Sequence, residues 1–173
     1  MSQTIQSDSN NPLVIQFQHN LWANLRLLDA CAELDETQLA ATAVGTFGDI
    51  YKTLNHIIRA ELRYTYHLTG RPQGIPLEME DDPDVAALRV YAQQTGESLI
   101  AIAAGTTPSD LVHLEWDNLR WPIPAGFLQA QALTHSTEHR VHVTTIMTQL
   151  GVEPPDLSGW AYIEDTVQPT PVE

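Results

Sequence analysis

The sequence predicts an all-α protein, a four-helix bundle with a small hairpin inserted between helices three and four. Three observations lead to this prediction. Apolar residues recur at three- and four-residue steps through four long segments. Capping residues, glycine or proline stand at most ends of these segments. A short alternation of apolar residues around an Asp-Asn pair precedes the fourth segment and is typical of a hairpin. With 173 residues, the chain is long enough for one domain with a full core.

The first helix is expected from Pro12 to about Glu33, because Asn11 is a favoured N-cap and proline fits the first helical position. Residues 1–11 are mostly Ser, Gln and Asn, and we expect them to be disordered. The apolar stripe of this helix is predicted to consist of Val14, Phe17, Leu21, Leu25, Leu28 and Ala32.

The second helix is expected to begin at Thr46, which together with Asp49 resembles a capping box, and to end at Gly70. Residues 71–81 contain proline and glycine and predict an irregular connection, long enough to cross an end of the bundle. The core residues of the second helix are predicted to be Ile50, Leu54, Ile57, Ile58, Leu62 and Leu68.

The third helix is expected to be capped by Asp82 and Pro83 and to end near Ala104, with Gly96 marking a close contact or a bend. Residues 112–121 predict the hairpin, with its turn at the Asp-Asn pair. The fourth helix is expected from about residue 125 to residue 150, before a glycine stop.

The bundle domain is expected to span residues 12–163, and residues 164–173 to form a flexible C-terminal tail. Trp160 and Tyr162 are predicted to dock back on the bundle.

Composition excludes several classes of partner. Lys and Arg number 8 against 22 Asp and Glu, which gives a formal net charge of −14. That charge disfavours DNA, RNA and anionic membranes. The single cysteine, Cys31, cannot form an internal disulfide and is expected to be buried, which fits a reducing cytoplasm. No secretory signal and no apolar run of about 20 residues is visible, so a cytoplasmic protein is expected.

The most informative feature is a pair of histidines in the fourth helix. His135 and His139 are four residues apart, so their imidazoles lie one turn apart on one face. His56 stands in the middle of the second helix, and two ligands from one helix with one from a neighbour can form a three-histidine metal site. The alternative is a polar, water-lined pocket or buried histidines held by hydrogen bonds. The inward stripe of this helix is expected to run Leu128, Gln131 or Ala132, His135, His139, His142, Ile146 and Leu150.

Two further residues are candidates around the site. His142 is predicted to be a hydrogen-bonding neighbour of the ligands, with a fourth ligand or a surface residue as alternatives. Glu61 is either an acceptor behind the ligands or a surface charge. Arg140 is expected to project away from the site, toward a carboxylate or a neighbouring subunit. The His-Glu-x-x-His signature of zinc peptidases is absent, because Ser136 follows His135.

The order and spacing of these motifs resemble the DinB/YfiT-like superfamily of metal-dependent enzymes. The segments that carry the resemblance are 19–28 with its Trp-Ala-Asn core, 53–61 around His56, 132–142 around the histidine pair, and the helix exit at 150–155. The resemblance implies that His56, His135 and His139 bind a divalent metal, commonly zinc or nickel. It also implies helices in up-down-down-up order and a homodimer. Some relatives are transferases that use a low-molecular-weight thiol.

We therefore expect a metal-binding protein that acts on a small molecule. The leading hypothesis is a metal-dependent S-transferase, in which a thiol cosubstrate ionises at the metal. The alternatives are a metal-dependent hydrolase and a non-catalytic, stress-related scaffold bundle. The catalytic residues, apart from the metal ligands, are not identified by the sequence.

Overall fold

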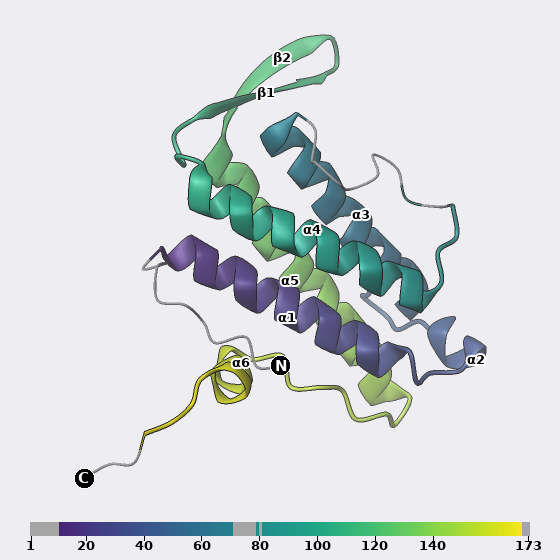
Figure 1. The fold of residues 1–173 in the computed structure, drawn as a ribbon. Coiled ribbons are helices and arrows are strands. Elements are labelled where there is room, and N and C mark those ends of the chain that lie inside the picture. The colour runs from purple at the N-terminus through teal and green to yellow at the C-terminus, as the bar shows by residue number, and fades with distance from the viewer. Residues whose placement is uncertain (1–10, 71–78, 80, 171–173) are drawn as a thin grey trace.

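The computed structural model describes residues 11–70, 79 and 81–170. The expected N-terminal disorder and most of the expected 71–81 connection lie outside these residues. Within the described part, the elements are helices α1 (Pro12–Cys31), α2 (Glu36–Leu39), α3 (Ile50–Thr69) and α4 (Val85–Gly105), strands β1 (Leu111–Trp116) and β2 (Leu119–Pro124), and helices α5 (Ala125–Gln149) and α6 (Gly159–Thr166). The four long helices form the bundle, and the hairpin projects from one end of it (Figure 1).

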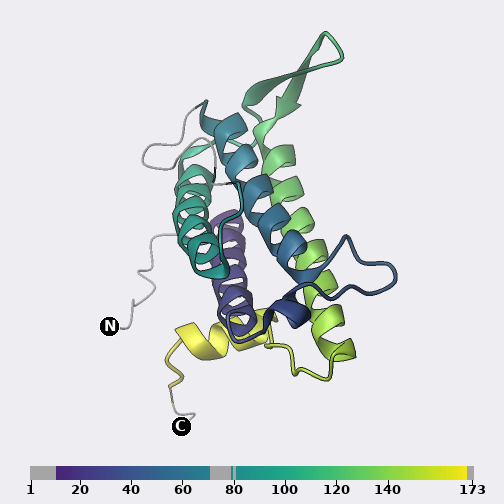
Figure 2. The same cartoon turned by 90° about the vertical axis from the view of Figure 1, so that its right-hand side faces the viewer.

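The long helices pack in up-down-down-up order, as the resemblance implied. Helix α1 packs on α4, α4 on α3, and α3 on α5, with a smaller α1–α5 contact. Asn11 at the start of α1 donates to the carbonyl of Ala103 near the end of α4 (3.1 Å), so these helices are antiparallel. Tyr51 near the start of α3 donates to the carbonyl of Pro83 before α4 (3.0 Å), so α3 and α4 run parallel. Figure 2 shows α3 and α5 side by side along one edge of the bundle.

The helix starts differ from the sequence predictions by a few residues. The N-cap of α3 is Asp49, whose carboxylate accepts the Lys52 N–H at 2.6 Å, and Thr46 instead closes a turn onto the Ala43 carbonyl. The N-cap of α4 is Asp84 and not Asp82. Both segments offer several capping side chains, and the one chosen is a carboxylate directly before the first helical residue.

The short helix α2 was not expected from the sequence. Asp35 caps it, and Gln38 returns a bond to the Asp35 N–H, which completes a capping box. Helix α1 correspondingly ends at Cys31, two residues earlier than predicted.

The core contains the predicted residues of α3 except Leu68, which is only partly buried. The larger cluster joins the second halves of α1 and α5 to the first halves of α3 and α4. A second cluster around Phe17 and Leu99 joins α1 to α4. Gly96 marks the predicted close contact, because a Cβ there would lie 2.5 Å from Leu21 Cδ1. Cys31 is fully buried, as expected.

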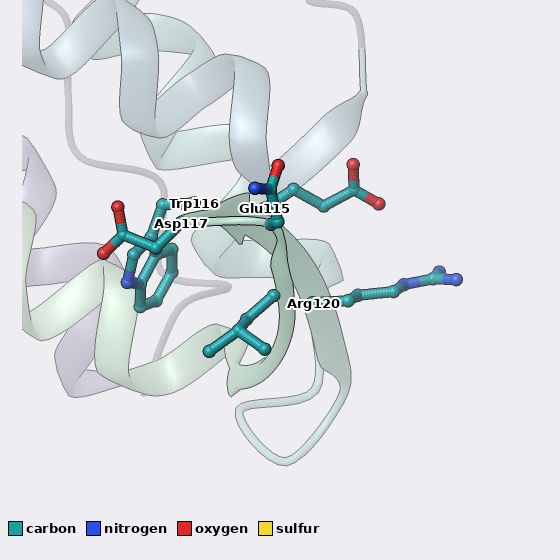
Figure 3. A pocket seen from close by; sticks show the side chains of 6 residues that line it. Glu115, Trp116, Asp117 and Arg120 are labelled. Atoms are coloured by element: carbon teal, nitrogen blue, oxygen red, sulfur yellow. The ribbon is translucent and has the colours of Figure 1, made fainter.

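The hairpin is confirmed and is longer than predicted, with Leu111 opposite Pro124 and Trp116 opposite Leu119. Asp117 and Asn118 both have positive φ, 53° and 59°, which is the backbone of a tight two-residue hairpin turn. Figure 3 shows the tip of the hairpin, where the Arg120 side chain extends away from the strands.

Helix α6 packs against the middle of α1. Tyr162 is buried, as predicted, whereas Trp160 is 81% exposed and does not dock. Asp165 binds Arg26 at 2.6 Å and accepts from the Trp22 indole at 3.2 Å. Helix α6 ends at Thr166, beyond the expected domain boundary at residue 163.

Candidate metal centre

Three predicted histidines meet between α3 and α5. His56 projects from the first half of α3, and His135 and His139 project one turn apart from the middle of α5. One candidate ligand atom from each ring lies within 4.8 Å of the other two. The Nε2 atoms of His56 and His135 are 2.9 Å apart. Among the described residues, this is the one group of three or more His, Cys, Asp or Glu side chains that could hold a metal ion.

The position of the histidines on α5 differs from the predicted stripe. Ala132 is buried and Gln131 is exposed, Leu150 is exposed, and His135 and His142 are only partly buried. The buried face of α5 includes the predicted Leu128, Ala132, His139 and Ile146, and it also includes Ser136, Arg140 and Val143. The histidines therefore stand at the margin of the buried face, where a bound ion would remain accessible from solvent.

The cluster is electrically neutral at pH 7. Burial lowers the pKa of all three rings, and neighbouring charges add to the effect: Arg63 acts on His56, and His56 acts on His135. The pKa of His139 is lowered to about 4, first by burial and then by the other histidines, against a small opposing effect of Glu138. A neutral imidazole has a free lone pair, which a metal ligand requires.

Two aromatic rings form walls around the cluster. Phe47 stacks on His56 with a centroid distance of 4.1 Å and meets His139 edge-on at 4.9 Å. Tyr64 stands edge-on to His135 at 6.1 Å. Phe47 is 52% exposed, so it covers the histidines from the solvent side without being part of the core.

Behind the histidines lies a buried polar network centred on Glu61, which is 1% exposed. Its Oε1 atom accepts hydrogen bonds from Asn20, Asn24 and Ser136, each at 2.7 Å. Glu61 is therefore a buried acceptor and not a surface charge. None of these bonds reaches a histidine; Glu61 instead holds Ser136, the neighbour of His135, and joins α1, α3 and α5.

Arg140 completes this network. Its guanidinium donates to the side-chain oxygens of Asn20 (2.6 Å) and Asn24 (2.7 Å), so the two asparagines bridge it to the Glu61 carboxylate. Burial lowers the pKa of Arg140 to about 10, and the charge of Glu61 opposes this shift. Arg140 was expected to reach a carboxylate or a neighbouring subunit, but it binds the side chains of two asparagines in the core of its own chain.

The remaining histidines lie outside the cluster. The ring of His142 is 5.2 Å from that of His139, and its buried Nδ1 has no hydrogen-bond partner among the described residues. His142 is thus a neighbour of the cluster, and the predicted hydrogen bond to a ligand is not formed. The others are His19, near the Leu157 carbonyl, His67, near the end of α3, and His113, on β1.

The donor set suits a divalent ion such as zinc. Two nitrogens bound at about 2.0–2.1 Å to a tetrahedral ion lie roughly 3.4 Å apart. The 2.9 Å between His56 and His135 is slightly shorter, so a small separation of the two rings would accommodate the ion. The Nδ1 atoms of His135 and His139 are buried without a partner among the described residues, so no hydrogen bond at Nδ1 orients either ring.

These features define a class of protein. Its members are four-helix bundles in up-down-down-up order, with a histidine cluster between the second and fourth long helices. The family model described as the DinB family matches residues 1–171. The chain belongs to the DinB family, as its sequence motifs indicated. A comparison with curated proteins finds no match.

One solved structure supports the fold. YfiT from Bacillus subtilis, described as a probable metal-dependent hydrolase with an unusual four-helix bundle topology, is similar with a TM-score of 0.62. The sequence identity is 14%, and the match covers 87% of this chain and 94% of YfiT. At this identity the likeness establishes the fold alone. In the described part of the chain, no helix is both long and apolar enough to cross a membrane.

Proposed function

We propose that this protein is a metal-dependent hydrolase that acts on a small molecule, with a divalent ion held by His56, His135 and His139. The convergence of three neutral imidazoles within 4.8 Å is the observation that carries the proposal. Three ligands leave a coordination position open for water or substrate, which is the pattern of catalytic and not of structural zinc sites. Zinc and nickel both suit imidazole ligands. The description of YfiT as a probable metal-dependent hydrolase agrees with this proposal.

The residues around the cluster have distinct roles in this proposal. A divalent ion bound here supplies Lewis acidity and lowers the pKa of water to about 7. Phe47 and Tyr64 exclude bulk water from one side and provide apolar surface for a substrate. Glu61 accepts three hydrogen bonds at Oε1 in the core, and its Oε2 is buried without a partner among the described residues, so we assign it a structural role in the network. His142, whose ring lies 5.2 Å from that of His139 and is partly exposed, is the neighbouring group that we propose to exchange a proton with the substrate.

Thiol-dependent transfer is the second candidate, and one observation favours it. The cluster of candidate ligands in the described residues consists of histidines alone, without a carboxylate that could act as a general base. A low-molecular-weight thiol needs no such base, because the metal itself stabilises the thiolate. Cys31 cannot supply the thiol, since burial raises its pKa to about 12. The comparisons with known proteins add no support to this candidate.

Elemental analysis of the purified, untagged chain tests the metal centre. We expect about one equivalent of zinc or nickel, which is lost in a His56→Ala/His135→Ala/His139→Ala variant. A His113→Ala variant is the matched control, because this exposed histidine lies on the hairpin. If the wild-type chain takes up no metal on reconstitution, the enzyme proposal is wrong and a non-catalytic scaffold takes its place.

Assays of ester, amide and phosphoester hydrolysis with and without added thiol then separate the two candidates. Hydrolysis without thiol supports the first, and turnover that requires a thiol supports the second. The homodimer implied by the family resemblance remains a proposal, which sedimentation analysis of the metal-loaded protein can test.

A further inference from the structure

Arg63 lies on the same side of α3 as the metal-binding candidate His56. Seven residues separate them, which is nearly two complete helical turns and a rise of about 10 Å. The Arg63 side chain is exposed to solvent, and so is that of His67, one turn further along the helix. A cation therefore stands beside the cluster, toward the hairpin end of the bundle.

This cation has no partner among the described residues. Arg26, Lys52 and Arg89 form ion pairs, Arg140 is bound in the buried network, and Arg59 donates to Asn55 and to the Asp81 carbonyl. Arg63 forms no ion pair or hydrogen bond in the described part of the chain, and Arg120 at the hairpin tip is the other described cation of which this is true. In a chain with 22 acidic and 8 basic residues, an unpaired arginine beside the candidate site is unexpected.

The surroundings of Arg63 are poor in negative charge. Helices α3 and α5 together contain four of the eight Lys and Arg residues but only two of the 22 Asp and Glu residues. One of those two is Glu61, whose carboxylate is buried and engaged by three donors. Because α3 and α5 are antiparallel, the second half of α3 faces residues 125–137 of α5, which include no acidic residue. The face that α3 and α5 form beside the cluster is thus poor in acidic residues, which lowers its repulsion of an anion.

We propose that Arg63 binds a carboxylate of the substrate and thereby determines which molecules are presented to the metal centre. This inference rests on the proposed function. A guanidinium binds a carboxylate through two parallel N–H···O bonds, which fix orientation as well as position. A monoanion suits the site better than a doubly charged phosphate, because one unpaired cation faces a chain of net charge −14. The two-turn spacing places the carboxylate several bonds away from the group that reacts, and Tyr64, which stands beside His135, can contact the apolar linker between them.

A binding experiment on the cobalt-loaded full chain tests this inference without relying on turnover. The probes are 6-mercaptohexanoate and 6-mercaptohexanol, which share a metal-binding thiol and a linker but differ in the terminal group. Binding is followed through the visible absorption of the cobalt ion. We expect the wild-type protein to bind the carboxylate probe roughly fivefold more tightly, as expected for one exposed charge pair, with a smaller preference at high salt.

Two arginine variants provide the comparison. Arg63→Gln should bind both probes equally, whereas Arg120→Gln, which removes the unpaired cation of the hairpin tip (Figure 3), should keep the wild-type preference. An equal affinity of the wild-type protein for both probes, or a preference that survives in Arg63→Gln, overturns the inference while the metal centre stands. Failure of the wild-type chain to take up cobalt refutes the metal centre itself, and the role of Arg63 with it.

Discussion

Replacing Glu61 by alanine should destabilise the protein more than any other single substitution near the site. The carboxylate is buried and accepts three hydrogen bonds, and its charge balances the buried guanidinium of Arg140. Its removal leaves the donors of Asn20, Asn24 and Ser136 with one acceptor fewer and the arginine without its counter-charge. Breaking a buried charge pair by removing one partner costs about 3–5 kcal/mol. That is a large part of the roughly 5–15 kcal/mol by which a domain is stable.

Thermal and urea unfolding of the metal-free protein measure this loss. For a chain of this size, each kcal/mol lowers the Tm by about 2–4 °C, so a fall of roughly 6–20 °C is expected. Glu61→Gln should lose less stability, because an amide oxygen can still accept hydrogen bonds from the asparagines. The Glu61→Gln variant should also still bind metal. Glu138→Ala, which removes an exposed carboxylate from α5, is the control and should change the free energy of unfolding by less than about 0.5 kcal/mol. A loss below about 1 kcal/mol in Glu61→Ala would show that the network contributes little to stability.

Three other predictions concern Gly96, Cys31 and Phe47. Gly96→Ala should destabilise by about 1 kcal/mol, because the clash of the new Cβ with Leu21 exceeds the gain in helix propensity, and urea unfolding measures this. The pKa of the Cys31 thiol rises from 9.0 to about 12 on burial, so it should resist alkylation in the native state. Above about pH 9 the unfolded chain releases this proton while the native chain retains it, so the stability that Cys31 contributes should decline as pH rises in a urea series. Phe47→Ala should leave the fold intact and accelerate removal of the metal by a chelator, followed by stopped flow, because the ring covers the histidines.

Matched variants and conditions control these three predictions. Gly105→Ala adds a methyl group where no atom lies within 4 Å, so it should not destabilise through a clash. Val44→Ala changes a fully exposed side chain of the loop that contains Phe47, and it should not alter the chelation rate. Alkylation of Cys31 should become rapid in denaturant, and rapid alkylation of the folded protein would contradict its burial.

The sequence predicted those features that depend on local periodicity. The four long helices and the hairpin follow from apolar spacing and from the Asp-Asn turn, and the proximity of His135 and His139 follows from helix geometry alone. The approach of His56 to that pair depends on which helices are neighbours. Periodicity contains no such information, so the family resemblance was needed to supply it.

The rotation of α1 and α5 about their own axes was predicted only in part. On α1, Val14, Phe17 and Leu28 are buried as expected, but Leu21 and Leu25 are only partly buried, whereas Asn20 and Asn24 are buried. On α5 the expected stripe included His142, which is only partly buried, and did not include Arg140, which is buried. In both helices the buried face is displaced toward polar residues, because these residues satisfy one another across the bundle. A signal was present, since Asn20 and Asn24 are four residues apart and continue the spacing of Val14 and Phe17.

The up-down-down-up order has a consequence for the unfolded chain. His56 and His135 are separated by 79 positions, yet they meet because α3 and α5 are neighbours. An ion bound by both residues would therefore close a long loop, as a covalent crosslink does. An unfolded chain that bound the ion through both residues would lose conformational entropy by closing this loop, whereas the folded chain already holds the two residues together. The unfolded chain, in which the three rings are no longer held together, would bind the ion more weakly. The free energy of unfolding would therefore depend on the metal concentration. A free metal concentration of 100 times the Kd would add about 2.7 kcal/mol to the stability of the native bundle.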